Sequence, residues 1–497
     1  MGPGPDLWDG ADDPGHRRGP RPGKGPGEGR RGHPVHRPAR PMKTASSLKI
    51  SISGVRGILG DSLTPQLAAA FAQAFGAYLG GGPVIVGRDA RPSGEMIGQA
   101  VIAGLLSVGC QPVEVGIIPT PSFLFLVKDA RAAGGVSVTA SHNPKEWNGL
   151  KFAGREGLYL TPHQTEEFLD IYHQGDFPLV PPDRLKAVKV EPRPTDPHLS
   201  KILGAVDVGR IRGRKVKVVV DSNNGAGAVL APRLLEALGC ETTLLYAAPT
   251  GEFAHDSEPL PENIGDVCRA VVERQADVGF VQDADADRLA VVDERGVPVG
   301  EELTLAIAAQ YVLGRKRGPV VCNLSTSRAL DDIARAAGVP CLRSKIGEIN
   351  VVESLLGAEP RAVIGGEGNG GVIYPDVHPC RDSFTAMALI LEALAATGGS
   401  LSDLAGAVPR YVMLKERLPG SAEQAHRLVH LLKRRYEGRG TVSLLDGLKV
   451  DFPDSWIHVR PSNTEPVIRV LAEAKTEARA RRDLETLKAE IFELLGK

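Results

Sequence analysis

The chain has 497 residues, of which 42% are hydrophobic and 5% aromatic, and its formal net charge at pH 7 is −1. A chain of this length can bury several cores, so we expect three or four domains. The balanced charge excludes a basic nucleic-acid footprint and an anionic-membrane patch. The lack of an apolar run of about 18 residues excludes a transmembrane span. Six cysteines without paired spacing indicate reduced core thiols of a cytosolic protein: Cys110, Cys240, Cys268, Cys322, Cys341 and Cys380.

Residues 1–41 differ from the rest of the chain, because they contain 10 Gly and 9 Pro, with eight Lys or Arg against five Asp or Glu. Such a segment has almost nothing to bury, so we expect it to be disordered. It lacks the apolar region of a secretory signal, and nucleic-acid contact by a basic tail is the lesser alternative. Met42, shortly before the strand-like residues 48–52, is a candidate translation start.

Three β-branched runs enter polar turns at wide intervals along the chain. They are residues 83–89, 216–225 and 319–323, and Ala/Leu-rich helical stretches follow them, such as residues 96–108 and 228–238. Strand, turn and helix in alternation predict βαβ units with mixed or mostly parallel sheets.

A short polar turn, Thr139-Ala140-Ser141-His142-Asn143-Pro144, follows the strand-like residues 135–138. We expect Ser141 to be an exposed hydroxyl nucleophile that the turn holds in place. An ordinary Asx-type turn is the alternative when the loop is considered alone. Three further polar loops favour the functional interpretation.

Three carboxylates occupy alternate positions of a second loop, Asp283, Asp285 and Asp287, after the apolar residues 278–281. Their oxygens can converge on one hard cation, and carboxylate oxygens suit Mg²⁺. A solvated acidic turn is the plain alternative.

An EF-hand is a sharper alternative for this loop, since Glu294 stands at the twelfth position, where that motif requires a bidentate ligand. However, Arg288 occupies the sixth position, where the turn of an EF-hand requires Gly. The flanking runs 278–281 and 289–292 also resemble strands and not paired helices. We therefore expect a Mg²⁺ loop between two strands.

Residues 365–371, Gly-Gly-Glu-Gly-Asn-Gly-Gly, are too glycine-rich for a strand or helix and too short for a linker. We expect the backbone to approach a ligand closely here, with Glu367 and Asn369 presenting a carboxylate and an amide to sugar hydroxyls. The spacing is not that of a dinucleotide-binding fingerprint, and a plain flexible loop is the alternative.

The C-terminal segment has a different pattern, typical of a small antiparallel sheet with two helices. Its strand-like runs are residues 410–414, 441–445, 447–452 and 456–460, and its helical runs are residues 423–437 and 476–495. The loop Arg460-Pro461-Ser462-Asn463-Thr464-Glu465-Pro466, followed by Arg469, supplies guanidinium and hydroxyl donors that can hold a phosphate dianion.

Four such loops in this order resemble the α-D-phosphohexomutase family, which includes phosphoglucomutase, phosphomannomutase and phosphoglucosamine mutase. The resemblance extends from Met42 to Lys497, with supporting stretches at residues 53–57, 87–91, 345–348 and 381–382. It implies three similar α/β domains with mixed sheets and a C-terminal α+β domain. The expected domains are residues 42–195 with the phosphoserine loop, 196–298 with the metal loop, 299–406 with the sugar-binding loop and 407–497 with the phosphate-binding loop.

The resemblance also implies a mechanism. No single pose brings O6 and O1 of one hexose to the same site, so Ser141, carried as phosphoserine, would pass its phosphoryl group to a hexose monophosphate and form a 1,6-bisphosphate that turns over. Asp283, Asp285, Asp287 and phospho-Ser141 would hold one Mg²⁺. A hexose 1,6-bisphosphate is the expected activator, and a sugar phosphate is the expected partner in the cytoplasm.

Roles for further residues follow from the same resemblance. Arg56 and Lys151 match positions used for proton transfer and charge stabilisation, although a surface lysine is the alternative for Lys151. His142 either orients the serine or makes a turn hydrogen bond. The expected substrate-binding residues are Arg288, Lys345, Glu367, Asn369, Arg460, Ser462, Asn463, Thr464 and Arg469.

One departure concerns the sugar-binding loop, where many relatives have Glu-x-Ser-Gly-His and this chain has Asn369 for Ser and Gly371 for His. This loop, together with residues 52–57 and 146–148, is most similar to phosphoglucosamine mutases. We therefore expect interconversion of glucosamine 6-phosphate and its 1-phosphate, with phosphomannomutase or phosphoglucomutase activity as the alternative.

Three other function classes are weaker. A catalytically silent sugar-phosphate-binding protein predicts decay of the serine or metal loop, which is not seen. A serine hydrolase requires an elbow such as Gly-x-Ser-x-Gly, in which Ser141 does not lie. A phosphatase with the same metal loop is chemically possible, and it would release inorganic phosphate.

Overall fold

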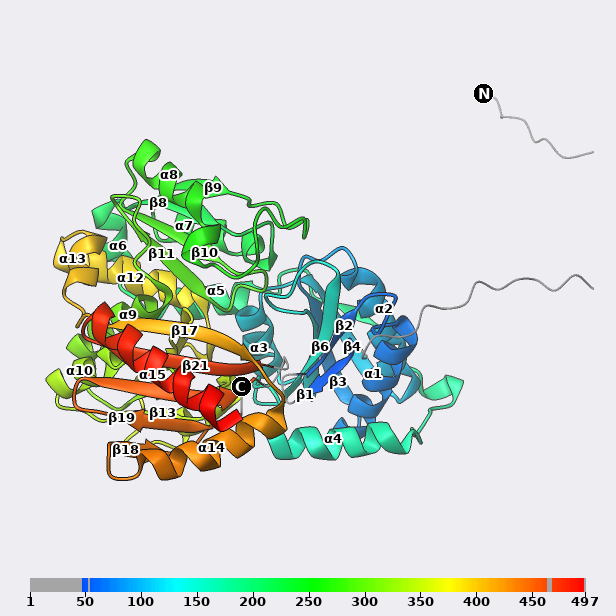
Figure 1. The fold of residues 1–497 in the computed structure, drawn as a ribbon. Coiled ribbons are helices and arrows are strands. Elements are labelled where there is room, and N and C mark those ends of the chain that lie inside the picture. Colours follow the sequence, from blue (N-terminus) through cyan, green and yellow to red (C-terminus); the bar gives the residue numbers. More distant parts are fainter. Residues whose placement is uncertain (1–46, 52–53, 463–466, 496–497) are drawn as a thin grey trace, which may run out of the picture. The chain divides into compact units, whose positions relative to one another are not determined.

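The computed structural model of the chain describes residues 47–51, 54–462 and 467–495, and residues from Ser46 onward form one compact unit with four sheets (Figure 1). The predicted disorder of residues 1–41 and the candidate start at Met42 lie outside the described residues. Among the described helices, none is long and apolar enough to cross a membrane.

The first sheet has seven strands in the order β1-β2-β6-β5-β3-β4-β7, and it is mixed, because β3 runs parallel to β4 and β5 while β6 is antiparallel to β5 and β2. One core packs α1, α2 and α4 against the sheet, and a second core lies under α3. The elements are β1 (Lys49–Ser51), β2 (Gly54–Ile58), α1 (Pro65–Leu79), β3 (Gly82–Arg88), α2 (Gly94–Ser107), β4 (Cys110–Ile117), α3 (Thr120–Asp129), β5 (Gly134–Val138), β6 (Trp147–Gly154), α4 (Pro162–Gln174) and β7 (Lys189–Val190).

The second sheet has four strands in the order β11-β10-β8-β9, with β10 parallel to β8 and antiparallel to β11. Its elements are α5 (Asp196–Leu203), α6 (Val208–Arg214), β8 (Lys217–Asp221), α7 (Ala231–Ala237), β9 (Glu241–Leu245), α8 (Gly265–Arg274), β10 (Val278–Gln282) and β11 (Leu289–Asp293). The predicted helix over residues 228–238 begins later, because a 3₁₀ turn occupies Ala226–Val229.

The third sheet has five strands in the order β13-β12-β14-β15-β16, parallel in its first half and antiparallel in its second. One continuous hydrophobic core joins the second and third sheets through α9 and α12. The elements are α9 (Glu301–Arg315), β12 (Val320–Asn323), α10 (Ala329–Ala336), β13 (Cys341–Ser344), α11 (Glu348–Leu356), β14 (Ile364–Glu367), β15 (Gly371–Tyr374), β16 (His378–Arg381), α12 (Ser383–Thr397) and α13 (Leu401–Gly406).

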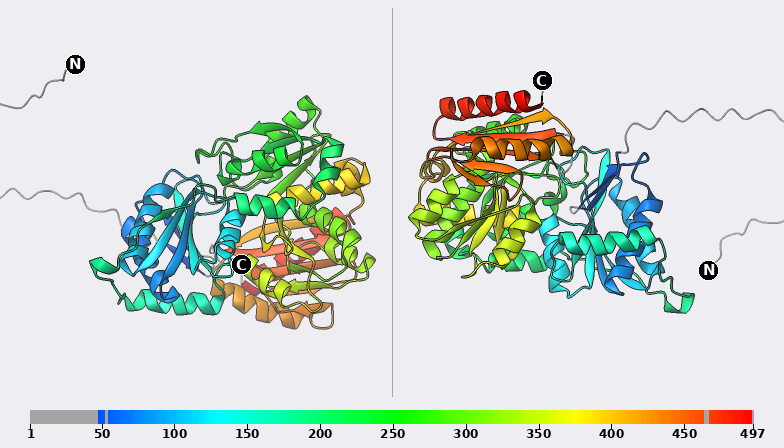
Figure 2. Two further views of the ribbon diagram at one scale, coloured as in Figure 1. Left: turned by 180° about the vertical axis from the view of Figure 1, so that it is seen from behind. Right: turned by 60° about the horizontal axis from the view of Figure 1, so that its bottom comes forward.

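The fourth sheet is antiparallel throughout, in the order β17-β21-β20-β19-β18, and a single core lies between it and the helices α14 and α15 (Figures 1 and 2). Its elements are β17 (Val412–Pro419), α14 (Ala422–Tyr436), β18 (Thr441–Ser443), β19 (Leu448–Asp451), β20 (Ser455–Pro461), β21 (Val467–Ala474) and α15 (Glu477–Leu495). The predicted two-helix sheet is confirmed, although the sequence reasoning missed β21.

The predicted fold class is thus confirmed: three α/β parts, each with a mixed sheet, are followed by a C-terminal α+β part. One local expectation was wrong, since Gly365 and Gly366 belong to strand β14 and not to a loop. Both glycines allow close strand packing, because a Cβ on Gly365 would lie 2.6 Å from the Val321 carbonyl oxygen and one on Gly366 would lie 2.1 Å from the Gly371 oxygen.

Candidate active site

Ser141 lies in the loop that joins β5 to β6, and its backbone adopts the left-handed conformation, with φ of 54°. A serine rarely adopts this conformation, and such strain concentrates at functional sites. Its amide donates to the Thr139 hydroxyl oxygen at 3.0 Å. The sequence suggested an exposed side chain, but Ser141 is only 2% accessible.

A fully buried guanidinium, that of Arg91, holds the backbone of the serine loop. Its acceptors are the carbonyl oxygens of Ser141, Asn143, Pro144 and Trp147 and the carboxylate of Asp89. Asp89 also accepts from the Thr139 hydroxyl at 2.6 Å. The loop is therefore held in place by a buried cation whose guanidinium N–H groups all donate hydrogen bonds.

The metal loop joins the antiparallel strands β10 and β11, as the sequence predicted for the runs on either side of it. Asp283, Asp285 and Asp287 are fully buried, and one carboxylate oxygen of each lies within 4.8 Å of the others. One oxygen of each carboxylate has no hydrogen-bond partner. Buried carboxylates are costly unless they are paired or bind a cation, so these three fit a divalent metal ion.

The three carboxylates affect one another's ionisation. Burial, reinforced by Asp287 and Asp285, raises the pKa of Asp283 well above its usual value. Burial acts in the same direction on Asp285, but the Lys151 ammonium and the hydrogen bonds that it and Thr120 donate lower the pKa of Asp285 overall. The loop thus concentrates negative charge around one position.

Lys151 and Thr120 connect the metal loop to the first sheet. Lys151 lies on β6, almost completely buried, and its Nζ is 3.0 Å from Oδ2 of Asp285. The Thr120 hydroxyl donates to the same oxygen at 2.9 Å, and the Thr120 amide donates to the Asp285 carbonyl. The alternative of a surface position for Lys151 is therefore wrong. Burial acts to lower the pKa of this lysine, but Asp285 raises the pKa overall.

His142 and Arg56 bring the serine loop into the same charged environment. Arg288, from the metal loop, donates through Nη2 to Nδ1 of His142 at 3.3 Å. Burial, with Arg288 and Arg56, lowers the pKa of His142 to about 2, so the ring is neutral. Since a guanidinium only donates, Nδ1 accepts and the ring proton belongs on Nε2. Arg56 Nη1 donates to Oδ1 of Asn143 at 3.0 Å.

Arg381, at the end of β16, bridges the metal loop and the sugar-binding loop. Its guanidinium pairs with Asp287 through Nη2 and with Glu367 through Nη1, the latter at 2.9 Å. Glu367 also accepts from Asn323 Nδ2 at 2.8 Å and from the Gly347 amide. Burial favours neutral Glu367, but Arg381 and these donors lower its pKa.

The glycine that replaces the family's histidine has a structural explanation. A Cβ on Gly371 would lie 2.4 Å from Cδ of Arg381, so a larger side chain here would require this arginine to shift. Asn369 accepts through Oδ1 from the Gly371 amide at 3.3 Å, and Leu289 of β11 donates its amide to the Gly370 carbonyl. The sugar-binding loop therefore rests on the metal hairpin.

The phosphate-binding loop belongs to the C-terminal sheet. Arg460 and Arg469 are register partners on β20 and β21, and the Ser462 amide closes the hairpin by donating to the Val467 carbonyl. Burial lowers the pKa of Arg460, while the carboxylates of Asp446 and Glu367 oppose that shift. Asn463 and Thr464 lie outside the described residues.

Lys345 is exposed between β13 and α11, and among the contacts of the described residues only its backbone carbonyl oxygen has a hydrogen bond, from the Ser344 hydroxyl. Its neighbour Ile346 donates its amide to Asp446 at 2.9 Å, which ties this turn to the fourth sheet. Direct contacts join the serine loop, the metal loop and the sugar-binding loop through Lys151–Asp285, His142–Arg288 and Arg381, whereas Lys345 lies in a separate turn.

Four residues with clear roles in the site were not among the predicted site residues: Arg91, Thr120, Glu348 and Arg381. Arg91, Glu348 and Arg381 lie in stretches that supported the family resemblance, so proximity to those motifs was a usable signal. Thr120 had none, because it contacts a residue 165 positions away.

Family models described as phosphoglucomutase/phosphomannomutase match four parts of the chain: domain I over residues 48–179, domain II over 196–296, domain III over 301–411 and the C-terminal domain over 421–491. A protein of Methanopyrus kandleri described as a probable phosphoglucosamine mutase is 37% identical over 86% of this chain and 94% of its own length. A Thermococcus kodakarensis protein described as phosphoglucomutase/phosphomannomutase is also 37% identical, over 87% of this chain and 96% of its own.

A solved structure from Burkholderia thailandensis, described as a phosphoglucomutase/phosphomannomutase family protein, has a TM-score of 0.79 and 29% identity, and covers 90% of this chain and 98% of its own. These similarities extend across all four sheets and all four loops. The chain therefore belongs to the α-D-phosphohexomutase family of mutase enzymes and, within it, to the phosphoglucosamine mutase branch.

Proposed function

We propose that this enzyme interconverts glucosamine 6-phosphate and glucosamine 1-phosphate, with Ser141 as the phosphoryl carrier and a 1,6-bisphosphate as intermediate. The observation that carries the proposal is the direct junction of the serine loop with the metal loop, through Lys151–Asp285 and His142–Arg288. A hexose 1,6-bisphosphate is the activator that would phosphorylate Ser141 before the first turnover.

The reaction needs one bond exchange in each half. The bond between phosphorus and Oγ of phospho-Ser141 breaks, a bond from phosphorus to the free sugar hydroxyl oxygen forms, and that hydroxyl loses its proton. After the bisphosphate turns over, the bond from phosphorus to the other sugar oxygen breaks and Oγ of Ser141 takes that phosphoryl group. The released sugar oxygen takes up a proton, which balances the proton lost in the first half. Positioning and charge stabilisation dominate such transfers, which the buried cations around Ser141 are suited to provide.

Mg²⁺ is the cofactor that fits the three carboxylates, and Asp283, Asp285 and Asp287 would hold it with an oxygen of phospho-Ser141. When bound, it would neutralise charge on the transferring phosphoryl group. Lys151 and Arg56 would take part in proton transfer and charge stabilisation at the acceptor hydroxyl, and Glu367 with Asn369 would bind the sugar edge. Arg460, Ser462, Asn463, Thr464 and Arg469 would hold the phosphate that is not reacting, with Arg288 and Lys345 along the same path.

The test of the carrier is Ser141→Ala. We expect turnover to fall to background with the fold intact, and intact-mass measurement to show one phosphate on the wild type and none on the variant. Ser137→Ala, a buried serine four residues earlier on β5, is the matched control and should keep both activity and phosphate. Near-normal activity of Ser141→Ala would refute the carrier role.

The same assay separates a mutase from a phosphatase. A mutase keeps total ester phosphate constant and requires a hexose 1,6-bisphosphate, whereas a phosphatase releases inorganic phosphate. Stoichiometric release of phosphate from the substrate would favour the second function.

The test of the sugar is a panel of glucosamine, glucose and mannose 6-phosphates. We expect the highest kcat/KM with the glucosamine ester, as the descriptions of several relatives suggest. A preference of roughly tenfold for glucose or mannose phosphate, about 1.4 kcal/mol of transition-state free energy, would refute the sugar assignment and leave the mutase chemistry standing.

A further inference from the structure

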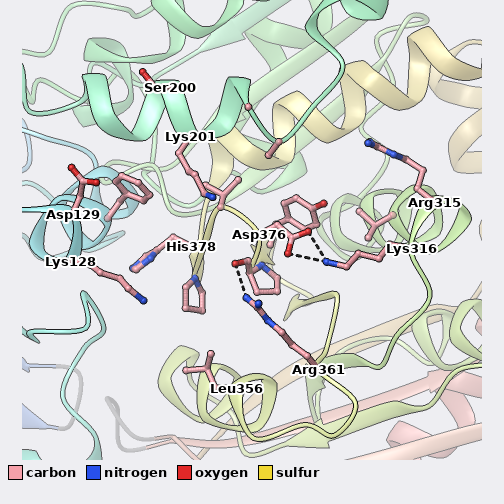
Figure 3. Close-up of a pocket in the computed structure, with 18 residues that line it drawn as sticks. Lys128, Asp129, Ser200, Lys201, Arg315, Lys316, Leu356, Arg361, Asp376 and His378 are labelled. Atoms are coloured by element: carbon pink, nitrogen blue, oxygen red, sulfur yellow. Dashed lines mark hydrogen bonds and ion pairs between the residues drawn. The ribbon is translucent and has the colours of Figure 1, made fainter.

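A second cavity of about 1070 Å³ lies where α3, α5, the C-terminal end of α9 and the β15–β16 hairpin meet (Figure 3). None of the residues that line it belongs to the candidate active site. Its wall is strongly cationic, since five lysine or arginine side chains and two aspartates line it. The proposed mutase reaction uses none of them.

Three of these cations have charge available for a ligand. Within the described part of the chain, Lys201 has no carboxylate within ion-pair distance, and Lys128 reaches only Glu156 at 3.8 Å, with both side chains more than half exposed. Arg361 donates one hydrogen bond, from Nη2 to the Pro375 carbonyl at 3.3 Å. Figure 3 shows Lys128, Lys201 and Arg361 directed into the space beside His378.

The other two cations are already used within the protein. Lys316 pairs with Asp376 at 2.7 Å, and Arg315 pairs with the buried carboxylate of Glu392. Asp376 is thus paired within the protein, and among the described lining residues Asp129 is the remaining carboxylate, so the three available cations leave an excess of positive charge. Three convergent cations match an anion with more than one phosphate group.

Apolar and aromatic side chains form the rest of the wall, among them Phe125, Leu356 and Val377. The ring of Phe125 is held in place, because it stacks on His198 at 5.4 Å between centroids and meets His378 edge-on at 5.8 Å. A fixed aromatic wall beside cations suits a ring system that carries phosphates, and the volume lies slightly above the roughly 300–1000 Å³ typical of ligand sites.

We propose that this cavity is a second ligand site, separate from the mutase centre, that binds a nucleoside diphosphate or triphosphate. The phosphates lie against Lys128, Lys201 and Arg361, and the nucleoside lies along the apolar wall. The proposal does not depend on which sugar phosphate the enzyme converts.

The test is calorimetric titration of the full chain with ADP, in excess chelator so that no cation links its phosphates to Asp283, Asp285 and Asp287. We expect Lys128→Ala/Lys201→Ala to weaken ADP binding by roughly tenfold or more, since both side chains would contact phosphate. Lys186→Ala/Lys189→Ala, which removes two exposed lysines elsewhere, is the matched control and should bind ADP as the wild type does.

Two further arms decide the location and the ligand class. Arg460→Ala should leave the affinity for ADP unchanged. If Arg460→Ala loses ADP binding while Lys128→Ala/Lys201→Ala retains it, ADP binds at the candidate active site and the proposal is overturned. Inorganic diphosphate should bind more weakly than ADP. Equal affinity would overturn the nucleoside part, and no ADP binding to the wild type at millimolar concentration would overturn the whole.

Discussion

Arg91 shows how much of the site depends on one side chain that touches no reacting atom. All five N–H groups of its guanidinium have acceptors, four of them backbone carbonyl oxygens of the loop that carries Ser141. Carbonyl groups that point at a buried cation cannot rotate freely, so the loop keeps the left-handed conformation of Ser141. Arg91 is thus a positioning residue for the nucleophile.

We predict that Arg91→Lys lowers kcat by roughly 100-fold with a smaller effect on KM, because a 1 Å misplacement of a reacting group has a cost of that order. Lysine has three donors against the five of arginine, and Asp89 loses its in-plane partner. The free energy of unfolding should fall by about 3 kcal/mol. Steady-state kinetics and urea unfolding measure the two effects.

Arg88→Lys is the matched control, since Arg88 ends β3 three residues earlier and, among the described residues, its one ion pair is with the exposed Glu95 at 3.5 Å. It should change kcat less than twofold, in line with about 0–1 kcal/mol for an exposed pair. Equal losses in both variants would show that the exchange of arginine for lysine at this strand end is harmful in itself, and that the contacts of Arg91 with the loop are not the cause.

The predictions from sequence succeeded for residues whose partners are local. Asp283, Asp285 and Asp287 share one tight loop, so their spacing alone predicted the cluster that the structure contains. Contacts such as Thr120–Asp285 and Arg381–Asp287 join residues 165 and 94 positions apart, and no local pattern encodes them. The burial of Ser141 was missed as well, since it depends on the tertiary structure and not on the local sequence.

At the scale of elements, the β10–β11 hairpin concentrates three carboxylates in a buried loop. Its left-handed Ala286, with φ of 58°, reverses the chain inside the loop. Asp283 accepts from the amides of Asp287 and Arg288, so one carboxylate shapes the turn as well as facing the others. Without a cation, the remaining carboxylate oxygens stay desolvated and repel one another.

We therefore predict that Mg²⁺ stabilises the folded protein. At a concentration of 100 times its Kd, the gain in free energy of unfolding is about 2.7 kcal/mol, if the unfolded chain binds no metal. Thermal unfolding in Mg²⁺ and in chelator should show the difference as a higher Tm with the metal. This readout does not require the enzyme to be active.

Asp285→Asn should abolish most of the Mg²⁺-dependent rise in Tm, whereas Asp256→Asn, at an exposed position between β9 and β10, should retain it. An unchanged metal effect in Asp285→Asn would mean that Mg²⁺ stabilises the protein at some other place.

Helix α3 illustrates which elements were predictable and which connections were not. Regular strand–helix alternation predicted the sheets, since periodicity is local, but the chain gave no indication that the N-terminal end of α3 would hold Asp285. From the same helix, Ser122 Oγ lies 2.9 Å from His198 Nδ1, and His198 Nε2 lies 3.0 Å from Asp382. The three α/β segments therefore contact one another through one buried chain of hydrogen-bonded side chains.

At the scale of the whole molecule, a second set of polar contacts joins the third sheet to the fourth. Arg328 donates to the carbonyl oxygens of Phe452, Pro453 and Ser455 and pairs with Asp451. Nearby, Lys415 of β17 contacts Glu301 and Glu302 at the start of α9, at 2.7 and 3.2 Å. Since Arg460 of the phosphate-binding loop belongs to the fourth sheet, these contacts help to place it.

Burial raises the pKa of Glu302 to about 7, although Lys415 and the amide of Ser327 act against the shift and Glu301 and Glu473 add to it. Between pH 4.5 and 7 the folded protein keeps a proton that an unfolded chain with the ordinary pKa has released. The stability that Glu302 contributes is therefore fully present below about pH 4.5 and is lost as the pH rises through about 7.

We predict that wild-type protein loses up to about 3 kcal/mol of unfolding free energy relative to Glu302→Gln as the pH rises from 4.5 to 8, since one pKa unit corresponds to about 1.36 kcal/mol. The glutamine cannot ionise, and its amide oxygen can still accept from Ser327. Urea unfolding of both proteins at several pH values measures the difference. Glu301→Gln removes a carboxylate that adds to this shift, so it should reduce the pH dependence without abolishing it. Parallel pH curves for wild type and Glu302→Gln would show that Glu302 is ionised throughout this range.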